Sequence, residues 1–172
     1  YGKTSKNLLR EDSTLVPINP YGTSKLIVEN LLNDVFQNNN ENWKIAILRY
    51  FNPIGAHNSG LIGEHPILKP NNIFPLIINS AFNKTKFKVF GNDWDTHDGT
   101  CIRDYIHVMD LADGHLKALN FLLKNEPTIL TLNIGIGKGI SVLELIKKFE
   151  DVNNTEVPWE FSERRKGDLP QL

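Results

Sequence analysis

The hydrophobic positions of the chain form helical stripes that alternate with short apolar runs. Residues 20–37 carry apolar side chains at a period near 3.6, which predicts a helix with one apolar stripe. The stripe comprises Leu26, Ile27, Leu31, Leu32, Val35 and Phe36, with Glu29, Asn33 and Asp34 facing away. Residues 44–51 have a continuous apolar centre between turn formers, which predicts a strand buried on both faces of a parallel sheet.

Similar patterns predict the other elements and an alternation of helices and strands. Strands are predicted at 87–90, 102–108, 130–134 and 157–161. Helices are predicted from Asn71 or Asn72 to Lys84, from an Asp110 cap through Leu122, and from a Ser141 cap to about Phe149, where Glu144 completes a capping box. Residues 1–19 and 52–72 are predicted to be loops. The second loop is long and rich in Gly, Pro, Asn and His, which indicates a functional segment.

The composition is that of a soluble globular protein. Among 172 residues, 40% are hydrophobic and 23% are charged, and the formal net charge is −1. Because acids and bases are interspersed, we expect neither nucleic acid nor a membrane as a partner. The single cysteine, Cys101, excludes an internal disulfide and fits a reducing compartment, so we expect a cytoplasmic protein. No apolar run approaches the ~20 residues of a membrane span, and we expect both ends to be truncated.

The stretch from Asn19 to Lys25 contains a candidate proton acceptor. Tyr21 and Lys25 are four residues apart at the start of the predicted helix, so both side chains leave one face, one turn apart. A neighbouring ammonium favours the ionised form of a phenol, which lets Tyr21 take a proton from a hydroxyl. A pair at this spacing is common by chance, so a helix start with an exposed lysine remains the alternative.

Three arginines are candidates for binding phosphate. Arg103, Arg164 and Arg165 lie beside predicted strand ends or loops, and a guanidinium fork matches the geometry of a phosphate. The alternative is that they are surface arginines in ordinary ion pairs. Asp168 either accepts hydrogen bonds from ribose hydroxyls or caps a turn.

Other motifs are incomplete. The five histidines have no paired-ligand spacing, so we expect no metal site. The glycines of residues 135–139 match neither G-x-G-x-x-G nor a Walker loop, and we interpret them as a tight turn. Ser24 has no G-x-S-x-G elbow around it and no evident histidine base, which argues against a hydrolase triad.

Six segments occur in order along nearly the whole chain: residues 19–25 (NPYGTSK), 48–57 (LRYFNPIGAH), 70–73 (PNNI), 90–93 (FGND), 98–110 (DGTCIRDYIHVMD) and 164–168 (RRKGD). Together they resemble the UDP-glucose 4-epimerase (UDP-galactose 4-epimerase) family of extended short-chain dehydrogenase/reductases. The first segment is common to all short-chain dehydrogenase/reductases. The second, third and fifth segments are close to diagnostic of this epimerase family.

The resemblance implies an NAD-dependent enzyme that interconverts UDP-galactose and UDP-glucose through a 4-keto intermediate. Tyr21 would take the proton of the sugar 4-hydroxyl, Lys25 would hold the nicotinamide ribose, and Phe51 would lie at the nicotinamide. The implied substrate contacts are Asn52, Asn72 and Ile73 on the substrate, Lys88, Val89 and Phe90 beside the uracil, Arg103 and Arg165 on the diphosphate, and Asp168 on the uridine ribose.

The resemblance also implies an α/β fold with two parts. Residues 1–51 and 103–124 would form the C-terminal part of a Rossmann-type NAD-binding domain, and residues 52–102 and 125–172 a smaller, truncated α/β substrate-binding domain. The family's glycine-rich phosphate loop and its serine beside the catalytic tyrosine have no counterpart here, so we expect a fragment that is inactive alone. In the full-length form a homodimer is expected. The alternatives are another nucleotide-sugar epimerase or dehydratase of the same family, and a UDP-sugar binding module without catalysis.

Overall fold

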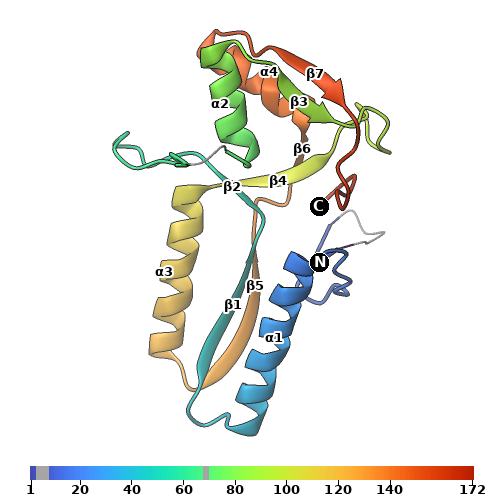
Figure 1. The fold of residues 1–172 in the computed structure, drawn as a ribbon. Coiled ribbons are helices and arrows are strands. Elements are labelled where there is room, and N and C mark those ends of the chain that lie inside the picture. The colour runs from blue at the N-terminus through green and yellow to red at the C-terminus, as the bar shows by residue number, and fades with distance from the viewer. Residues whose placement is uncertain (3–7, 68–69) are drawn as a thin grey trace.

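Two lobes joined by a short central sheet make up the structure (Figure 1). It is a computed structural model that describes residues 1–2, 8–67 and 70–172. Parts of the two predicted loops, residues 3–7 and 68–69, lie outside the described residues. Helices and strands alternate along the chain, which confirms the predicted α/β class. None of the helices in the described ranges has the length and apolar character needed to cross a bilayer.

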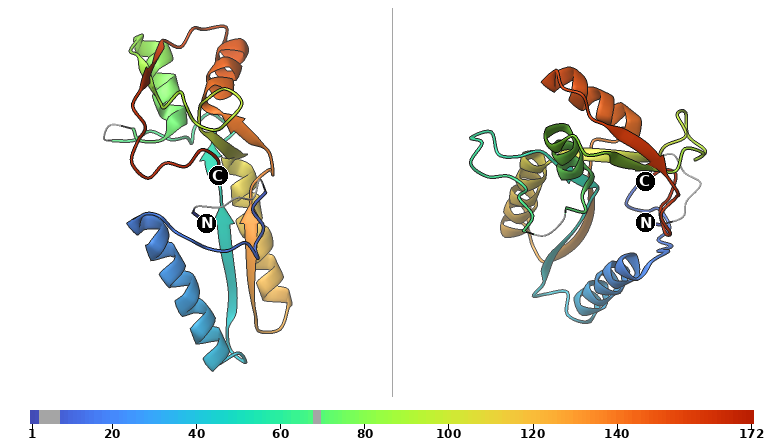
Figure 2. Two further views of the ribbon diagram at one scale, coloured as in Figure 1. Left: turned by 90° about the vertical axis from the view of Figure 1, so that its right-hand side faces the viewer. Right: turned by 45° about the horizontal axis from the view of Figure 1, so that its top comes forward.

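The first lobe is a two-stranded parallel sheet flanked by helices (Figure 2). Strand β1 (Lys44–Tyr50) pairs with β5 (Thr128–Ile134) in a register that runs from Lys44↔Thr128 to Tyr50↔Ile134. Helices α1 (Pro20–Asn38) and α3 (Val108–Lys124) stand on opposite sides of this pair. Because the strands are parallel, their carboxyl ends meet at one edge of the sheet, and that edge is directed toward the second lobe.

The central sheet consists of three strands, two of which the hydrophobic pattern missed. Strand β4 (Ile102–His107) pairs in parallel with β2 (Asn52–Ile54) and antiparallel with β6 (Gly139–Ser141). Strands β2 and β6 contain only three residues each, which is too few for an alternating pattern to emerge. For this reason β2 was indistinguishable from the long loop that follows it.

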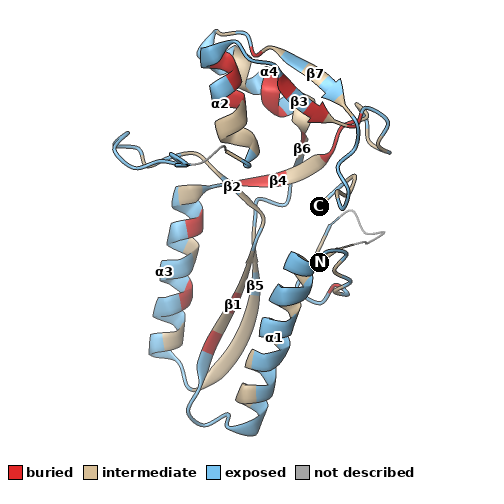
Figure 3. Ribbon diagram, viewed as in Figure 1, coloured by how far each residue is buried: buried red, intermediate tan, exposed pale blue. Residues whose placement is uncertain are grey.

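The second lobe contains the main hydrophobic core (Figure 3). Helices α2 (Ile73–Asn83) and α4 (Val142–Asn153) lie in this lobe with the parallel strands β3 (Phe87–Phe90) and β7 (Trp159–Ser162). Strand β7 begins two residues later than predicted. The core cluster consists of Ile77, Ala81, Phe87, Val89, Tyr105, Leu145, Ile146 and Val157. One of these residues belongs to β4, so the central sheet is part of this core.

One helix cap agrees with the sequence and another does not. Ser141 and Glu144 form the predicted capping box at the start of α4. Asp110 does not cap α3, contrary to the prediction, because β4 runs directly into this helix and Asp110 already lies within its first turn. The cap is His107, whose Nδ1 accepts the backbone N–H of Met109.

The faces of α1 also differ from the predicted ones. Glu29 was expected to face away from the core, yet it is half-buried and forms an ion pair with Arg49 of β1. Ile27 and Leu31, which were assigned to the apolar stripe, are 60% and 59% exposed. The other members of the stripe are half-buried, and the remaining polar residues are exposed, as predicted: Leu26, Leu32, Val35 and Phe36, and Asn33 and Asp34. The prediction was wrong for Glu29 because an ion pair between a helix and a strand leaves no trace in hydrophobic periodicity.

The pairing of β1 with β5 bears on the predicted division into domains. Residues 44–50 were assigned to the NAD-binding domain and residues 128–134 to the substrate domain, but the two strands are hydrogen-bonded along their whole length. A division at residue 125 would cut through this sheet, so residues 128–134 must be grouped with the first part. The rest of the division stays a prediction.

Candidate functional site

A cavity of about 240 Å³, here named the Arg103 cavity, is lined by residues from β2, α2, β3, β4 and the segment after β7. It gathers eight of the nine residues that the resemblance assigns to the substrate: Asn52, Asn72, Ile73, Lys88, Phe90, Arg103, Arg165 and Asp168. The ninth, Val89, is 1% exposed and belongs to the hydrophobic core. Residues that are more than a hundred positions apart in the sequence therefore meet at one place.

Strand β4 directs alternate side chains into the Arg103 cavity. Arg103 and Tyr105 line it, whereas Asp104 between them lines a second cavity. Nη1 of Arg103 donates to the carbonyl oxygens of Ile102 at 2.8 Å and Leu169 at 2.9 Å, so the backbone holds the guanidinium in place. Burial raises the pKa of Tyr105 to about 12, which keeps this phenol neutral near pH 7.

The structure separates two arginines that are adjacent in the sequence. The guanidinium carbon of Arg165 lies 4.7 Å from the ring centroid of Phe90, at the wall of the Arg103 cavity. Its Nε donates to Asp168 at 2.9 Å. Arg164 instead donates through Nε to Asp93 at 2.7 Å. Arg165, and not Arg164, is thus placed to contact a ligand in the cavity.

Protein acceptors fix the orientation of the two asparagine amides in the Arg103 cavity. Asn52 donates through Nδ2 to the carbonyl oxygen of Asp104 at 3.0 Å. Asn72 donates through Nδ2 to Oε1 of Glu64 at 2.6 Å, and it precedes α2 without making a side-chain cap bond. With an N–H committed to the protein, each amide retains an oxygen acceptor that suits a hydroxyl group.

Sequence reasoning missed three buried residues of the Arg103 cavity, Phe87, Cys101 and Tyr105. The alternation of the predicted strand contained a signal for Tyr105, because it lies two residues after Arg103 and thus on the same face. Cys101 precedes the strand, where no such signal exists. Burial raises the pKa of its thiol, so it is a weak nucleophile.

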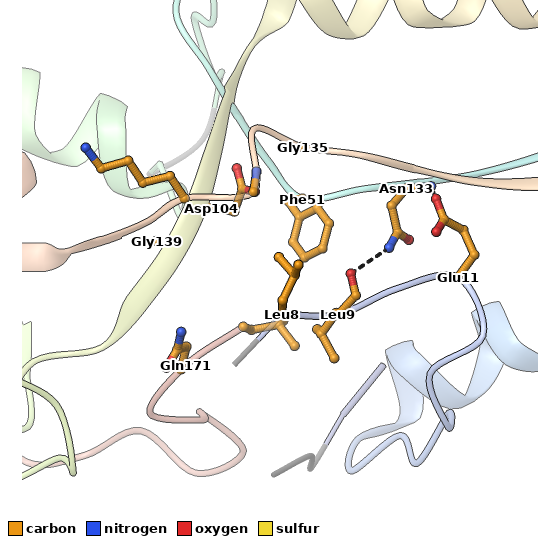
Figure 4. A pocket seen from close by; sticks show the side chains of 12 residues that line it. Leu8, Leu9, Glu11, Phe51, Asp104, Asn133, Gly135, Gly139 and Gln171 are labelled. Carbon is orange, nitrogen blue, oxygen red and sulfur yellow. Dashed lines mark hydrogen bonds between the residues drawn. The ribbon is translucent and has the colours of Figure 1, made fainter. Parts of the chain in front are cut away.

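A second cavity of about 250 Å³, the Phe51 cavity, lies at the carboxyl ends of β1 and β5 (Figure 4). Phe51 directly follows β1, and its ring extends toward Leu8 and Leu9. Gly135 directly follows β5 and lines the same cavity. Open parallel sheets bind ligands in the crevice outside the carboxyl ends of their strands, so this position favours a ligand site.

Asp104 accounts for the glycine-rich turn that borders the Phe51 cavity. Its carboxylate accepts the backbone N–H groups of Ile136 at 3.0 Å and Gly137 at 2.7 Å. A Cβ atom on Gly135 would lie 2.6 Å from Cδ2 of Phe51 and 2.7 Å from Oδ2 of Asp104, so a larger residue there would displace one of these side chains. These N–H groups are directed at a protein carboxylate and not at a phosphate, in agreement with a tight turn.

The tyrosine–lysine pair lies in the first two turns of α1, as predicted. Nζ of Lys25 is 5.1 Å from the ring centroid of Tyr21, so the two side chains share one face. The Tyr21 side chain is exposed, and neither residue lines the Arg103 cavity or the Phe51 cavity. The structure therefore brings the pair together but does not join it to the predicted substrate contacts.

Comparison with known proteins assigns the chain to a family. Residues 1–135 match the model of the NAD dependent epimerase/dehydratase family. The chain belongs to this family. Within the epimerase/dehydratase group it is 49% identical over 170 residues to UDP-glucose 4-epimerase from Bacillus subtilis, an alignment that covers 98% of this chain and 50% of that protein.

Solved structures agree with the epimerase/dehydratase fold. UDP-glucose-4-epimerase from Stenotrophomonas maltophila, with bound NAD and formylated UDP-arabinopyranose, is 45% identical and superposes with a TM-score of 0.92 over 99% of this chain and 50% of that one. UDP-glucose 4-epimerase from Bifidobacterium longum, in complex with NAD+ and UDP, is 41% identical with a TM-score of 0.91, covering 97% and 50%. The chain spans about half the length of the curated relatives it matches.

Proposed function

We propose that this chain provides the acid–base pair and the substrate cavity of an NAD-dependent UDP-glucose 4-epimerase, which interconverts UDP-galactose and UDP-glucose. The observation that carries the proposal is the Arg103 cavity, where eight assigned substrate residues converge. The 49% identity to a UDP-glucose 4-epimerase supports it, as does the similarity to an epimerase structure solved with NAD+ and UDP. Because the chain spans about half the length of such relatives, we assign the activity to a longer protein. We propose that this protein is cytoplasmic.

A nucleoside diphosphate suits the charges of the Arg103 cavity. Arg103 and Arg165 approach it from β4 and from the segment after β7, and guanidinium groups bind phosphate oxygens bidentately. Asp168 is paired with Arg165, so a phosphate that engages this arginine releases a carboxylate oxygen to accept a ribose hydroxyl. Lys88 and Phe90 would flank the uracil, with Val89 between them contributing its backbone.

The described residues fit the nicotinamide end of NAD and not its pyrophosphate. Tyr21 and Lys25 offer a phenol and an ammonium on one exposed helix face, and Phe51 offers an aromatic ring at the carboxyl edge of the sheet. Pyrophosphate is normally held by free backbone N–H groups of a glycine-rich turn at a helix N-terminus. The turn at residues 135–137 donates its N–H groups to Asp104, so we assign pyrophosphate binding to residues beyond this chain.

The proposed chemistry uses Tyr21 as the proton carrier. NAD, when bound, supplies the acceptor and later the donor of the hydride at the sugar C4. Tyr21 would take the proton of the 4-hydroxyl as the carbonyl forms, and it would return a proton to that oxygen when the hydroxyl is restored with the opposite configuration at C4. The ammonium of Lys25 lies 5.1 Å from the ring centroid of Tyr21, one helical turn away, so it is placed on the same helix face as the proposed proton carrier.

The longer protein is further proposed to be a homodimer. Helix α1 contributes no buried residue to the described structure, and its Ile27, Val28 and Leu31 side chains are more than half exposed. Apolar side chains gathered on one helix surface favour a contact with another chain.

The test uses the longer chain and two sugar nucleotides. We expect conversion of UDP-galactose to UDP-glucose and no reaction with dTDP-glucose, which a related dehydratase would consume. Arg103→Ala should weaken UDP binding about tenfold or more by calorimetry, because a charge-assisted contact to phosphate is worth roughly 1.5–3 kcal/mol. Lys117→Ala, on the exposed surface of α3, is the matched control. If the longer chain binds UDP tightly but converts no UDP-galactose, it is a UDP-sugar binding module and not an epimerase.

A further inference from the structure

A largely buried ion pair joins helix α1 to strand β1. Nε of Arg49 donates to both carboxylate oxygens of Glu29, at 2.9 and 3.2 Å, and Nη2 donates to Oε2 at 2.6 Å. The two side chains are 15% and 17% exposed. The hydrogen bonds that Arg49 donates to Glu29 raise the pKa of Arg49, so the guanidinium is charged throughout the accessible pH range.

Arg49 also connects this helix to the aromatic ring of Phe51. Nη1 of Arg49 donates to the hydroxyl of Tyr1 at 3.2 Å, and the guanidinium carbon lies 5.1 Å from the Tyr1 ring centroid. The Tyr1 ring is stacked on Phe51, with centroids 6.4 Å apart and planes at 16°. The Tyr1 hydroxyl in turn donates to Oδ1 of Asn133 on β5. A single guanidinium therefore contacts α1 on one side and the support of Phe51 on the other.

The position of Glu29 on α1 connects this ion pair to the Tyr21–Lys25 pair. Glu29 lies four residues after Lys25 and eight after Tyr21, so the three side chains leave neighbouring sides of the helix, spread over roughly 12 Å of its axis. The helix buries no residue completely, so the bidentate ion pair is the directional contact that opposes sliding or turning of α1 on the sheet. Any such movement changes the distance between Tyr21 and Phe51.

We propose that Glu29 and Arg49 are positioning residues, which fix the Tyr21–Lys25 pair relative to the nicotinamide-facing ring of Phe51. The inference rests on the proposed function, because it assumes that Tyr21 and Phe51 act on the same reacting atoms. Proton transfer at the 4-hydroxyl oxygen and hydride transfer at the carbon that bears it require both groups at their correct places, and a misplacement of about 1 Å can cost roughly 10²-fold in rate.

The chemistry of the pair favours positioning over simple stabilisation. A buried ion pair gives little net stability compared with two apolar side chains of similar size, whereas its bidentate geometry is directional. Leucine or methionine would hold α1 against β1 without fixing its register. The ion pair between Lys117 and Asp113 on α3 differs from the Glu29–Arg49 pair, because it is exposed and joins residues of a single helix. It therefore cannot position one element relative to another.

The experiment compares Glu29→Gln, Arg49→Lys and the control Asp113→Asn in the longer chain. Glu29→Gln keeps the shape and one hydrogen-bond acceptor, and Arg49→Lys keeps the charge but loses the fork. We expect kcat for UDP-galactose to fall about 10- to 100-fold in both, with the dissociation constant of UDP within about twofold of wild type. Asp113→Asn should change none of these.

The outcomes separate the inference from the function on which it rests. If the wild-type longer chain does not epimerise UDP-galactose, the proposed function fails first. If wild type is active and both variants bind UDP with unchanged kcat, the positioning role is wrong, even where the melting temperature falls. A variant that loses both UDP affinity and kcat would also contradict the positioning role. The ion pair would then stabilise the fold as a whole and would not act on the register of α1.

Discussion

At the scale of single residues, the surroundings of a side chain decide its role more than its type does. Arg164 and Arg165 are adjacent and chemically identical, yet one is held by Asp93 and the other lines the Arg103 cavity beside Phe90. Residue type alone makes both of them candidates for phosphate, and only the resemblance to the epimerase family selected Arg165. The choice comes from the path of the chain after β7, which no local pattern predicts.

Replacing Tyr21 tests the proposed proton carrier. Tyr21→Phe removes the hydroxyl but keeps the ring, and general acid–base groups supply about 10²–10⁴-fold in rate. We expect kcat of the longer chain to fall by about that factor, while the affinity for UDP measured by calorimetry stays unchanged. Wild-type turnover in this variant would show that another group moves the proton.

At the scale of elements, two segments of the resemblance turn out to contact each other. Gly55, in the loop after β2, packs against the imidazole of His107 at the end of β4. Gly55 has a φ of +92°, and a Cβ atom there would lie 2.6 Å from Cδ2 and Nε2 of His107. Both the backbone and the available space therefore require glycine at this position.

The loss of stability caused by a side chain at Gly55 can be measured by comparison with a matched glycine. Gly60 also has a positive φ, of +71°, but no atom lies within 4 Å of its Cβ position. Both Gly55→Ala and Gly60→Ala incur backbone strain, while only Gly55→Ala also overpacks, at about 1–3 kcal/mol. We expect urea denaturation to give a lower free energy of unfolding for Gly55→Ala by that difference. Equal values for the two variants would contradict the packing argument.

A second element-scale feature ties the turn before β4 to the start of α4. Asp98 accepts hydrogen bonds from the N–H and hydroxyl of Thr100, both at 2.8 Å, and from the hydroxyl of Ser141. Burial acts to raise the pKa of this carboxyl, but the hydrogen bonds from Ser141 and Thr100 outweigh it and hold the pKa below its ordinary value. The ionised form is therefore favoured in the folded state.

The lowered pKa of Asp98 predicts an acid-dependent contribution to stability. Between the folded and unfolded pKa values the unfolded chain binds more protons, so the contribution is complete above about pH 4 and is lost as pH falls through the folded value. Asp98→Asn should be less stable than wild type by about 1–3 kcal/mol at pH 7. Urea denaturation from pH 7 down to pH 3 should show this gap shrinking, whereas a gap independent of pH would rule out the carboxylate as its cause.

The long elements were predictable and the short ones were not, for a physical reason. Helices α1, α3 and α4 and strands β1 and β4 contain enough residues for a period to emerge. Strands β2 and β6 exist because β4 offers them backbone partners, which is a tertiary cause. The same limit applies to Glu29, since its partner Arg49 comes from another element. Residues of the Arg103 cavity were predicted through their resemblance to a family, and the approach of Asp98 to Ser141 was not predicted at all.

At the scale of the whole molecule, the chain exposes more surface than its size requires. Its accessible area is 11830 Å², whereas a compact monomer of 19.6 kDa exposes about 8,600 Å². Part of the exposed apolar surface lies on the two helices of the first lobe. Side chains there that are about half exposed or more include Ile27, Val28 and Leu31 of α1 and Leu116, Leu119, Phe121 and Leu123 of α3.

This exposed apolar surface predicts how the 172 residues behave alone. Within the described ranges, β1 is paired with β5 and its other edge meets no further strand, so it presents backbone donors and acceptors to any available partner. Together with the exposed helix faces, this edge should make the isolated chain poorly soluble or prone to non-specific association. We also expect it to retain no NAD, because Tyr21, Lys25 and Phe51 reach only the nicotinamide end and the amides of the turn at 135–137 are occupied by Asp104.

The measurement is to purify these 172 residues, release and quantify any bound nucleotide, record the oligomeric distribution by light scattering, and assay UDP-galactose conversion with added NAD. The expected result is no turnover, no stoichiometric NAD and a broad mass distribution. The Arg103 cavity is formed entirely within the chain, so weak UDP binding should survive in whatever fraction stays monomeric. Turnover or stoichiometric NAD would show that the pyrophosphate of the cofactor is held by residues already present, and that the two lobes described here are sufficient for catalysis.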